Sequence, residues 1–160
     1  MANVDNPNGF QFAYSETGYV QMASGTVAAS NTIAAGDAIV VSDQTAGQIM
    51  IALSSTALIL GVAAEAVVVG AGATDTIMFY PANPWMIFEG QCSGTYADTI
   101  QYTAVDIEGT TGIMEVNENA TTETVVYILG KVGDSAVGAN TRVLFRFIRS
   151  SYCPLLAAAS

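Results

Sequence analysis

The chain has no histidine and very few basic residues. Without histidine, the commonest general base and metal ligand is missing, and Ser-His-Asp and Cys-His catalytic sites are excluded. The only cations are Lys131, Arg142, Arg146 and Arg149, and every carboxylate except that of Asp134 precedes them. The net charge is −10. Phosphate binding needs a basic surface, so we expect no nucleic-acid partner, and an anionic membrane is disfavoured for the same reason.

Charge of either sign is scarce. Asp, Glu, Lys and Arg make up 11% of the residues, against roughly 25% in an ordinary soluble domain. Hydrophobic residues make up 51%, many of them small or β-branched. A surface with little charge is easier to bury against another protein, because few ions must be desolvated. An Ala- and Thr-rich β protein without such a partner is the plainer alternative, and the composition favours assembly.

Neither the cysteines nor the apolar runs indicate secretion or a membrane segment. Cys92 and Cys153 form no Cys-x-x-Cys pattern, so we expect two free buried thiols, with a bridge between them as the open alternative. Residues 1–9 are polar and Asn-rich, unlike a signal peptide. The longest apolar block, 57–73, contains Glu65 and is shorter than the roughly 20 residues of a spanning helix. We expect a cytosolic product with no membrane segment and no membrane partner.

The start of the chain predicts an extended arm that leads into an aromatic strand. Residues 1–9 combine Asn, Asp, Pro and Gly without periodicity. Phe10, Phe12 and Tyr14 then alternate with smaller residues, which is a strand pattern that puts the three rings on one face. This strand is either the first strand of the protein's own sheet or a strand that adds to the sheet of a partner.

The rest of the chain reads as short strands separated by turns at about ten-residue spacing. We predict an all-β fold, a single compact β-barrel or sandwich of short antiparallel strands with an extended N-terminal arm. The arm covers 1–15, the barrel or sandwich domain 16–150 and a C-terminal tail 151–160. The expected strands are 19–22, 38–42, 47–53, 58–63, 66–69, 76–80, 85–89, 99–104, 112–116, 124–132 and 142–148. Residues 154–160 are expected to form at most one short terminal turn.

No constellation of residues predicts catalysis. A Ser–Lys dyad would need Lys131, which no serine motif accompanies. Carboxylates cluster in 106–109 and 115–123, but neither segment has the spacing of a calcium-binding EF-hand. We therefore predict a non-enzymatic protein with no catalytic residue, no metal site and no cofactor.

The C-terminal strand predicts one basic face. In 142–149, Val143, Phe145 and Phe147 would share one face, and Arg142 and Arg146 the other. Two alternatives remain open for the arginines. They neutralise carboxylates of this protein, or they dock against an acidic partner.

Three segments of the sequence resemble segments of small bacteriophage head decoration (cement) proteins, whose barrel is sometimes called a β-tulip. They are Ile33-Ala-Ala-Gly-Asp-Ala-Ile-Val-Val41, Gly47-Gln-Ile-Met-Ile51 and Ile59-Leu-Gly-Val-Ala-Ala64. The likeness covers roughly residues 1–90, and 95–150 match no pattern of that family. It implies a homotrimer on the outer capsid surface whose N-terminal arm contacts the major capsid protein.

These observations predict a viral structural protein that binds the outer surface of an assembled phage capsid and stabilises it. The partners would be the major capsid protein and further copies of the chain, and the protein would reside in the virion. The candidate partner-binding residues are Phe10, Phe12, Tyr14, Arg142 and Arg146. The alternative is a head-fibre or tail-associated module that binds a host receptor or glycan through exposed aromatics, with Trp85, Tyr96 and Tyr102 as candidates.

Overall fold

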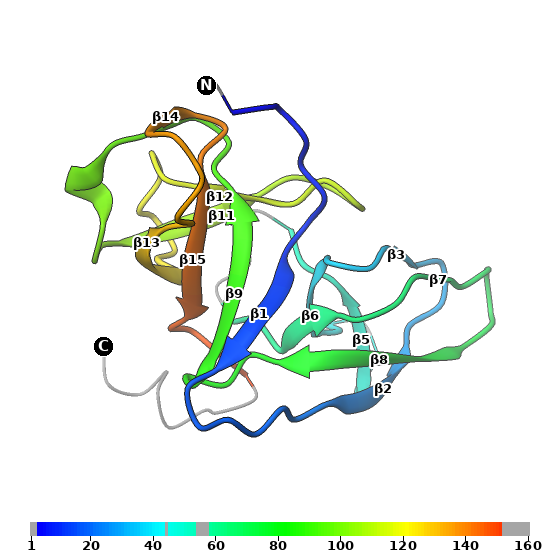
Figure 1. Cartoon of the computed structure of the whole chain (residues 1–160). Coiled ribbons are helices and arrows are strands. Elements are labelled where there is room, and N and C mark those ends of the chain that lie inside the picture. Colours follow the sequence, from blue (N-terminus) through cyan, green and yellow to red (C-terminus); the bar gives the residue numbers. More distant parts are fainter. Residues whose placement is uncertain (1–2, 44, 54–57, 152–160) are drawn as a thin grey trace.

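The computed structural model confirms the predicted all-β fold (Figure 1). It describes residues 3–43, 45–53 and 58–151. The strands of the first half are β1 (Gln11–Ser15), β2 (Ala23–Val27), β3 (Thr32–Ile33), β4 (Ala38–Val41), β5 (Gln48–Ile51), β6 (Gly61–Ala63), β7 (Val67–Val68) and β8 (Asp75–Pro81). Those of the second half are β9 (Met86–Gln91), β10 (Thr95–Tyr96), β11 (Ala104–Glu108), β12 (Glu115–Asn117), β13 (Val126–Lys131), β14 (Gly138–Ala139) and β15 (Arg142–Phe147), with one 3₁₀ turn, η1 (Asp98–Ile100).

Five strands of the first half close into a barrel in the order β2-β5-β4-β6-β8. Its interior is filled by apolar side chains that include Val27, Ile39, Ile77 and Phe79. Four of the five junctions are antiparallel, as predicted, but β2 and β5 pair in parallel. That parallel pair closes the barrel and was not visible in the turn pattern.

Five strands of the second half and β1 from the start of the chain form a six-stranded sheet in the order β1-β9-β15-β13-β11-β12. The sheet curls, because a parallel bridge joins Cys92, just after β9, to Val116 of β12. β1 is an edge strand of this sheet, paired with β9. The first strand of the chain therefore lies beside the ninth, and the last strand lies between β9 and β13 (Figure 1).

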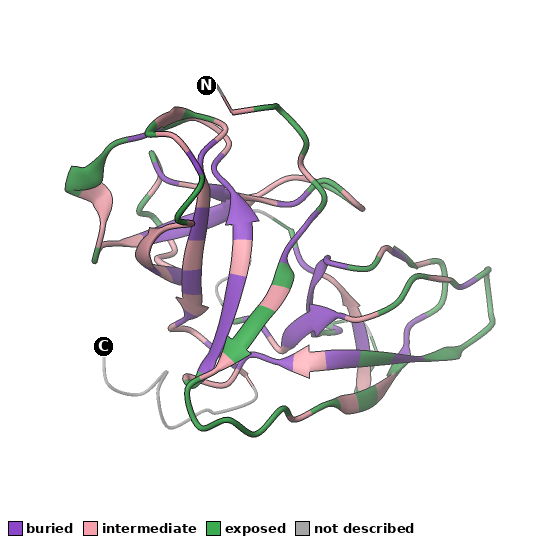
Figure 2. Cartoon of the chain, viewed as in Figure 1, coloured by how far each residue is buried: buried purple, intermediate pink, exposed green. Residues whose placement is uncertain are grey.

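A shared core joins the barrel and the sheet. One cluster of buried side chains contains Val40 and Val62 from the barrel together with Phe88 and Phe145 from the sheet. Figure 2 shows the buried positions concentrated where the two meet. The barrel and the sheet thus bury apolar surface against each other, which is the dominant favourable term in folding.

Two of the expected strands are wrong and several short ones were missed. Residues 19–22 contain no strand, and most of 99–104 is the η1 turn and the residues after it. The missed β2 has the sequence Ala-Ser-Gly-Thr-Val, whose small and polar residues give little strand signal. β3, β10 and β14 are two residues each, too short to show periodicity. The predicted tail turn and Cys153 lie outside the described residues.

No helix within the described part of the chain is long and apolar enough to cross a membrane.

Candidate partner-binding surface

The predicted aromatic strand belongs to the protein's own sheet, but its three rings do not share a face. Phe10 is buried, with its ring centroid 5.0 Å from that of Phe145. Phe12 stacks on Tyr80 at 4.8 Å. The register shifts between Phe12, which opposes Phe88, and Tyr14, which opposes Ile87. This β-bulge at Ala13 turns Tyr14 to the outer face, where it is 45% exposed.

The predicted partner contact through Phe10 therefore needs correction. Phe10 is 1% exposed and closes the core over β9. A Cβ atom at Gly90 would lie only 2.7 Å from the Phe10 ring, so β9 needs a glycine at that position. Without unfolding β1, Phe10 cannot reach a partner.

The N-terminal leader, residues 3–9, is extended as predicted but is fastened to the protein's own loops. The Asn3 amide donates hydrogen bonds to the carbonyls of Ala136 (2.7 Å) and Ala139 (2.9 Å). Its oxygen accepts from the Ala136 amide (2.9 Å) and the Ser135 hydroxyl (3.2 Å). Sequence analysis missed Asn3, because a single Asn in an Asn-rich leader carries no distinguishing pattern.

The end of the leader is held by a close backbone approach. The Phe10 amide donates to the Gly36 carbonyl at 2.7 Å. Gly9 and Gly36 both have positive φ, and a Cβ atom on Gly9 would lie 2.8 Å from the Gly36 carbonyl. Only glycine fits this approach without strain.

The two arginines of β15 lie on the outer face and pair with the protein's own carboxylates. Arg142 forms an ion pair with Glu89 of the neighbouring strand. Arg146 forms one with Glu16 at 2.8 Å and also donates to the Pro84 carbonyl at 3.1 Å. The inward positions of Val143, Phe145 and Phe147 are confirmed by their burial. Neutralisation of internal acids is thus present in the structure, and docking of a partner by the arginines stays a prediction.

Arg146 holds together two loops that carry exposed apolar side chains. The 16–22 loop runs beside the β8–β9 loop. The backbone N–H of Glu16 donates to the Trp85 carbonyl at 2.9 Å, and the side-chain amide of Asn83 donates to the side-chain oxygen of Gln21 at 3.0 Å. The exposed apolar residues on and beside these loops form what we call the aromatic rim. They are Tyr14, Tyr19, Val20, Met22 and Trp85, each 42–74% exposed.

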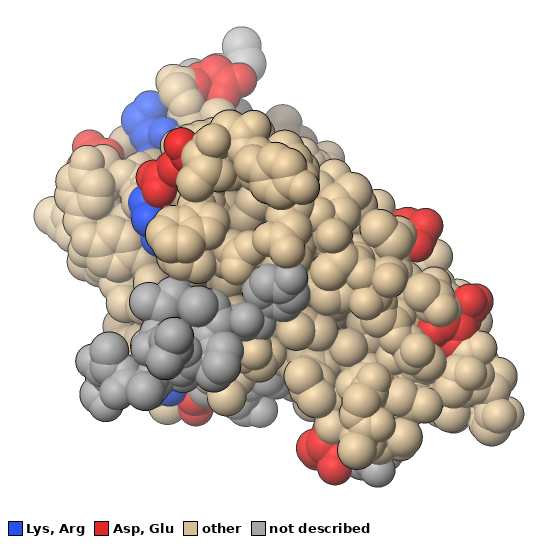
Figure 3. All heavy atoms as spheres, turned by 90° about the horizontal axis from the view of Figure 1, so that it is seen from below, with Lys and Arg blue, Asp and Glu red and all other residues tan. Residues whose placement is uncertain are grey.

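The aromatic rim carries almost no charge. Glu16 is the one residue within 14–22 that carries a charge at neutral pH, and it is paired with Arg146. Figure 3 views the molecule from below, the side on which the 16–22 loop lies in Figure 1, and shows few charged atoms there. Exposed apolar side chains gathered at one place mark protein interaction sites more often than isolated ones do. A partner would therefore desolvate few ions in covering the rim.

The three aromatics of the alternative interpretation do not form one surface. Trp85 and Tyr102 are 52% and 64% exposed, but Tyr96 is buried at 1%. The expectation that Tyr96 is available to a glycan is therefore wrong.

Two acidic residues of the second half, Asp106 and Glu115, accept hydrogen bonds within the fold. Asp106 is buried and accepts hydrogen bonds from the amides of Thr122, Glu123 and Thr124. Partial burial raises the pKa of Glu115; a hydrogen bond from Gln91 opposes this and the nearby carboxylates add to it. No group of three or more metal-ligating side chains occurs among the residues that the structure describes.

Cys92 is a buried free thiol. Burial, with a smaller contribution from the negative charges of Glu118 and Glu115, raises its pKa to about 12. The thiolate form, which is the reactive one, is therefore suppressed at neutral pH.

Comparison with protein-family models, curated proteins and solved structures finds no match to this chain. The geometry of the surface is accordingly the basis for any functional proposal.

Proposed function

We propose that this protein is a structural protein that binds the outer surface of an assembled phage capsid and stabilises it. The observation that carries the proposal is the aromatic rim, an exposed and nearly uncharged apolar surface on a chain of net charge −10. The resemblance of residues 1–90 to head decoration proteins is the reason for proposing a phage capsid as the surface to which the protein binds. The major capsid protein is the proposed partner.

The negative net charge of the protein favours binding to the outer surface of the capsid over binding to its inner surface. Packaged DNA is densely anionic and repels an acidic protein, so an outer position is the easier one. The exposed acids other than Glu16 lie outside the rim loops; they are Asp5, Asp43, Glu65, Asp75, Asp98 and Asp134. A capsid subunit that covered the rim would meet one carboxylate, that of Glu16, which is paired with Arg146, and so would avoid the cost of burying an unpaired charge.

Stabilisation would follow from mass action. A protein that binds the assembled lattice and not the free subunits shifts the equilibrium towards assembly. Many modest contacts, repeated by the symmetry of the shell, add up to a large effect. We propose a homotrimer as the binding unit, which multiplies the rim contacts threefold.

The test is co-sedimentation of the purified protein with capsids from which it has been stripped. We expect the wild type to bind, and the double variant Tyr19→Ser/Trp85→Ser to bind roughly tenfold or more weakly, because buried aromatic anchors dominate interface energies. The matched control is Val68→Ser/Tyr102→Ser, which removes two equally exposed apolar side chains outside the rim.

Two outcomes would contradict the proposal in different ways. If the wild type does not bind stripped capsids, the function is wrong. If the wild type binds and both double variants bind equally well, the capsid contact lies elsewhere and the rim has another role. Binding to host cells that depends on Trp85 and Tyr102 would favour the receptor-binding alternative.

A further inference from the structure

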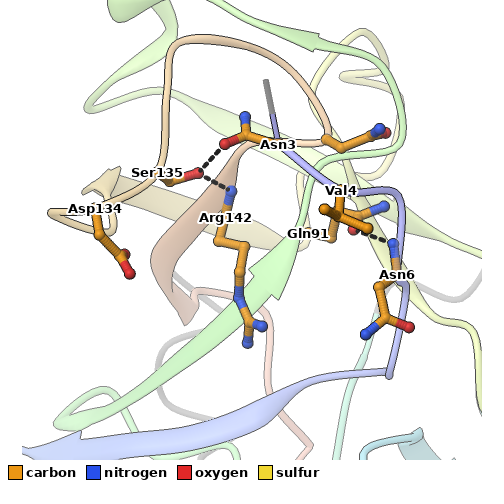
Figure 4. A pocket seen from close by; sticks show the side chains of 8 residues that line it. Asn3, Val4, Asn6, Gln91, Asp134, Ser135 and Arg142 are labelled. Atoms are coloured by element: carbon orange, nitrogen blue, oxygen red, sulfur yellow. Dashed lines mark hydrogen bonds between the residues drawn. The ribbon is translucent and has the colours of Figure 1, made fainter. Parts of the chain in front are cut away.

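A polar hollow of about 240 Å³ lies at the end of the six-stranded sheet far from the aromatic rim. Three segments meet there, namely the leader, the end of β9 and the loop that precedes β15 (Figure 4). The side chains that matter for its chemistry are Asn3, Asn6, Gln91, Asp134, Asn140 and Arg142.

Part of the wall is fixed by hydrogen bonds within the protein. Asn3 is fully engaged by Ser135, Ala136 and Ala139. Gln91 is 5% exposed, accepts from the Asn6 amide at 2.9 Å, and donates to Asp5 and Glu115. These two side chains hold the leader and β9 in place, so the hollow is formed before any ligand arrives.

Other groups at the hollow have hydrogen-bonding capacity left over. The side chains of Asn6, Asn140 and Asp134 make no hydrogen bond to any residue that the structure describes. Arg142 pairs through Nε with Glu89, and one terminal nitrogen donates a long hydrogen bond of 3.5 Å to Gln11, which leaves the other terminal N–H groups for a ligand. Asn140 lies in the turn between β14 and β15 with a left-handed backbone, φ 56°, a conformation that asparagine adopts more readily than most residues.

The chemistry of these groups selects a neutral, hydroxylated ligand. Two amides both donate and accept, Asp134 accepts and Arg142 donates, which matches hydroxyl groups that do both. The Arg142 guanidinium is already paired with Glu89, so the hollow offers an anion no free positive charge, and no group of three or more metal-ligating side chains lies among the described residues to hold a metal cation. Among the residues that line the hollow, Val4 is the sole large apolar one, which leaves no platform for a nucleobase.

Size points to a single sugar ring. Sites for drug-sized ligands measure roughly 300–1,000 Å³, and this hollow is smaller. We infer that the hollow formed by Asn6, Asn140, Asp134 and Arg142 binds one hexose-sized saccharide unit, such as the exposed end of a surface polysaccharide.

The position of the hollow suits a protein that is seated on a capsid through the rim. β9 begins directly after Trp85 of the rim and ends at Gln91 of the hollow. When the rim faces the shell, the hollow faces outwards, where a host-cell polysaccharide could reach it. This orientation rests on the proposed function, whereas sugar binding by the isolated protein does not.

The test is an NMR titration of ¹⁵N-labelled full-length protein with glucose, galactose, mannose and N-acetylglucosamine separately. We expect at least one sugar to cause saturable shifts at Asn6, Gln91 and Asn140, in the millimolar range. Asn140→Gly removes the amide but keeps the left-handed backbone, and should weaken binding about tenfold. Ser30→Gly makes the same kind of change at another left-handed residue, φ 60°, which does not line the hollow, and should leave binding intact.

The inference is overturned if none of the four sugars gives saturable shifts at the hollow, or if shifts appear only around Trp85 or Tyr102. It is also overturned if Asn140→Gly and Ser30→Gly bind alike. Capsid binding is measured separately, by co-sedimentation. A failure to bind sugar therefore leaves the proposed capsid binding untouched, and a failure to bind capsids leaves the proposed sugar binding untouched.

Discussion

Arg146 and Glu16 lie 130 positions apart in the chain, and their side chains meet at 2.8 Å. The same guanidinium donates to the Pro84 carbonyl. One side chain of the last strand therefore fixes both loops that present the aromatic rim. Arg146 is a positioning residue for that surface, whether or not it also touches a partner.

Replacing Arg146 with Met should loosen the rim and destabilise the fold. The Pro84 carbonyl loses a charged donor, and such hydrogen bonds are worth about 1.5–3 kcal/mol. Urea unfolding should show a loss of that order. Glu16→Gln, which removes only the exposed ion-pair partner, should cost less than about 1 kcal/mol. Equal losses for the two variants would show that the contact with Pro84 contributes nothing.

Asp37→Ala should be among the most destabilising single changes in the barrel. Asp37 is fully buried and accepts from the amides of Ala34 (2.8 Å) and Gly112 (2.7 Å). Burial raises its pKa, and these two bonds lower it in part. Leaving two half-buried amides without their acceptor should cost about 1–3 kcal/mol in chemical unfolding. The exposed Asp43→Ala should change stability by less than about 0.5 kcal/mol, and a similar loss there would refute a specific role for Asp37.

Glu115→Gln should stabilise the protein at neutral pH. Because the pKa of Glu115 is raised in the folded state above its ordinary value of 4.5, its charge disfavours folding at pH 7. As the pH falls through the raised pKa, the folded state takes up the proton first and recovers that stability. Glutamine keeps an acceptor for Gln91 without the charge.

The advantage of Glu115→Gln over the wild type should therefore shrink as the pH falls from 7 and disappear only below 4.5, where Glu115 is protonated in both states. Unfolding free energies of the two proteins across this range provide the measurement. An advantage that grew on acidification would mean that the carboxylate is stabilised in the fold.

Asn3→Ala should free the leader without unfolding the domain. Five hydrogen bonds hold the Asn3 side chain, yet Val4 beside it is 80% exposed and buries little apolar surface. Hydrogen exchange at the Ala136 and Asn6 amides should accelerate at least about tenfold, since local openings are governed by such contacts. Asn8→Ala is the control, and unchanged exchange in Asn3→Ala would show that the leader is held by other contacts.

The faces of the C-terminal strand were predictable because its alternation is strong. Val143, Phe145 and Phe147 are large and apolar, and two of the three positions that alternate with them in β15 are arginines, Arg142 and Arg146, with Leu144 between these two. The aromatic alternation of the first strand was equally clear, yet it gave the wrong face for Tyr14. A bulge inserts one residue and reverses the alternation beyond it, and Ala13 shows nothing in the sequence that would mark it.

The aromatic rim was predicted only in part. Tyr14 was among the candidates, and Trp85 was named for a different function. Tyr19, Val20 and Met22 were assigned to a strand that does not exist. Their exposure depends on where the 16–22 loop lies, which is decided by contacts with Asn83 and Arg146 far along the chain. Local patterns carry no information on such distant contacts.

The position of β15 between β9 and β13 also governs when this protein can fold during its synthesis. The ribosome must release the chain as far as residue 147 before this strand of the sheet is available, and until then Phe10 has no Phe145 against which to pack. Pairings between segments this remote in sequence make for slow folding. A nascent chain that ended before residue 142 would hold the β1–β9 pair without the strand that joins β9 to β13.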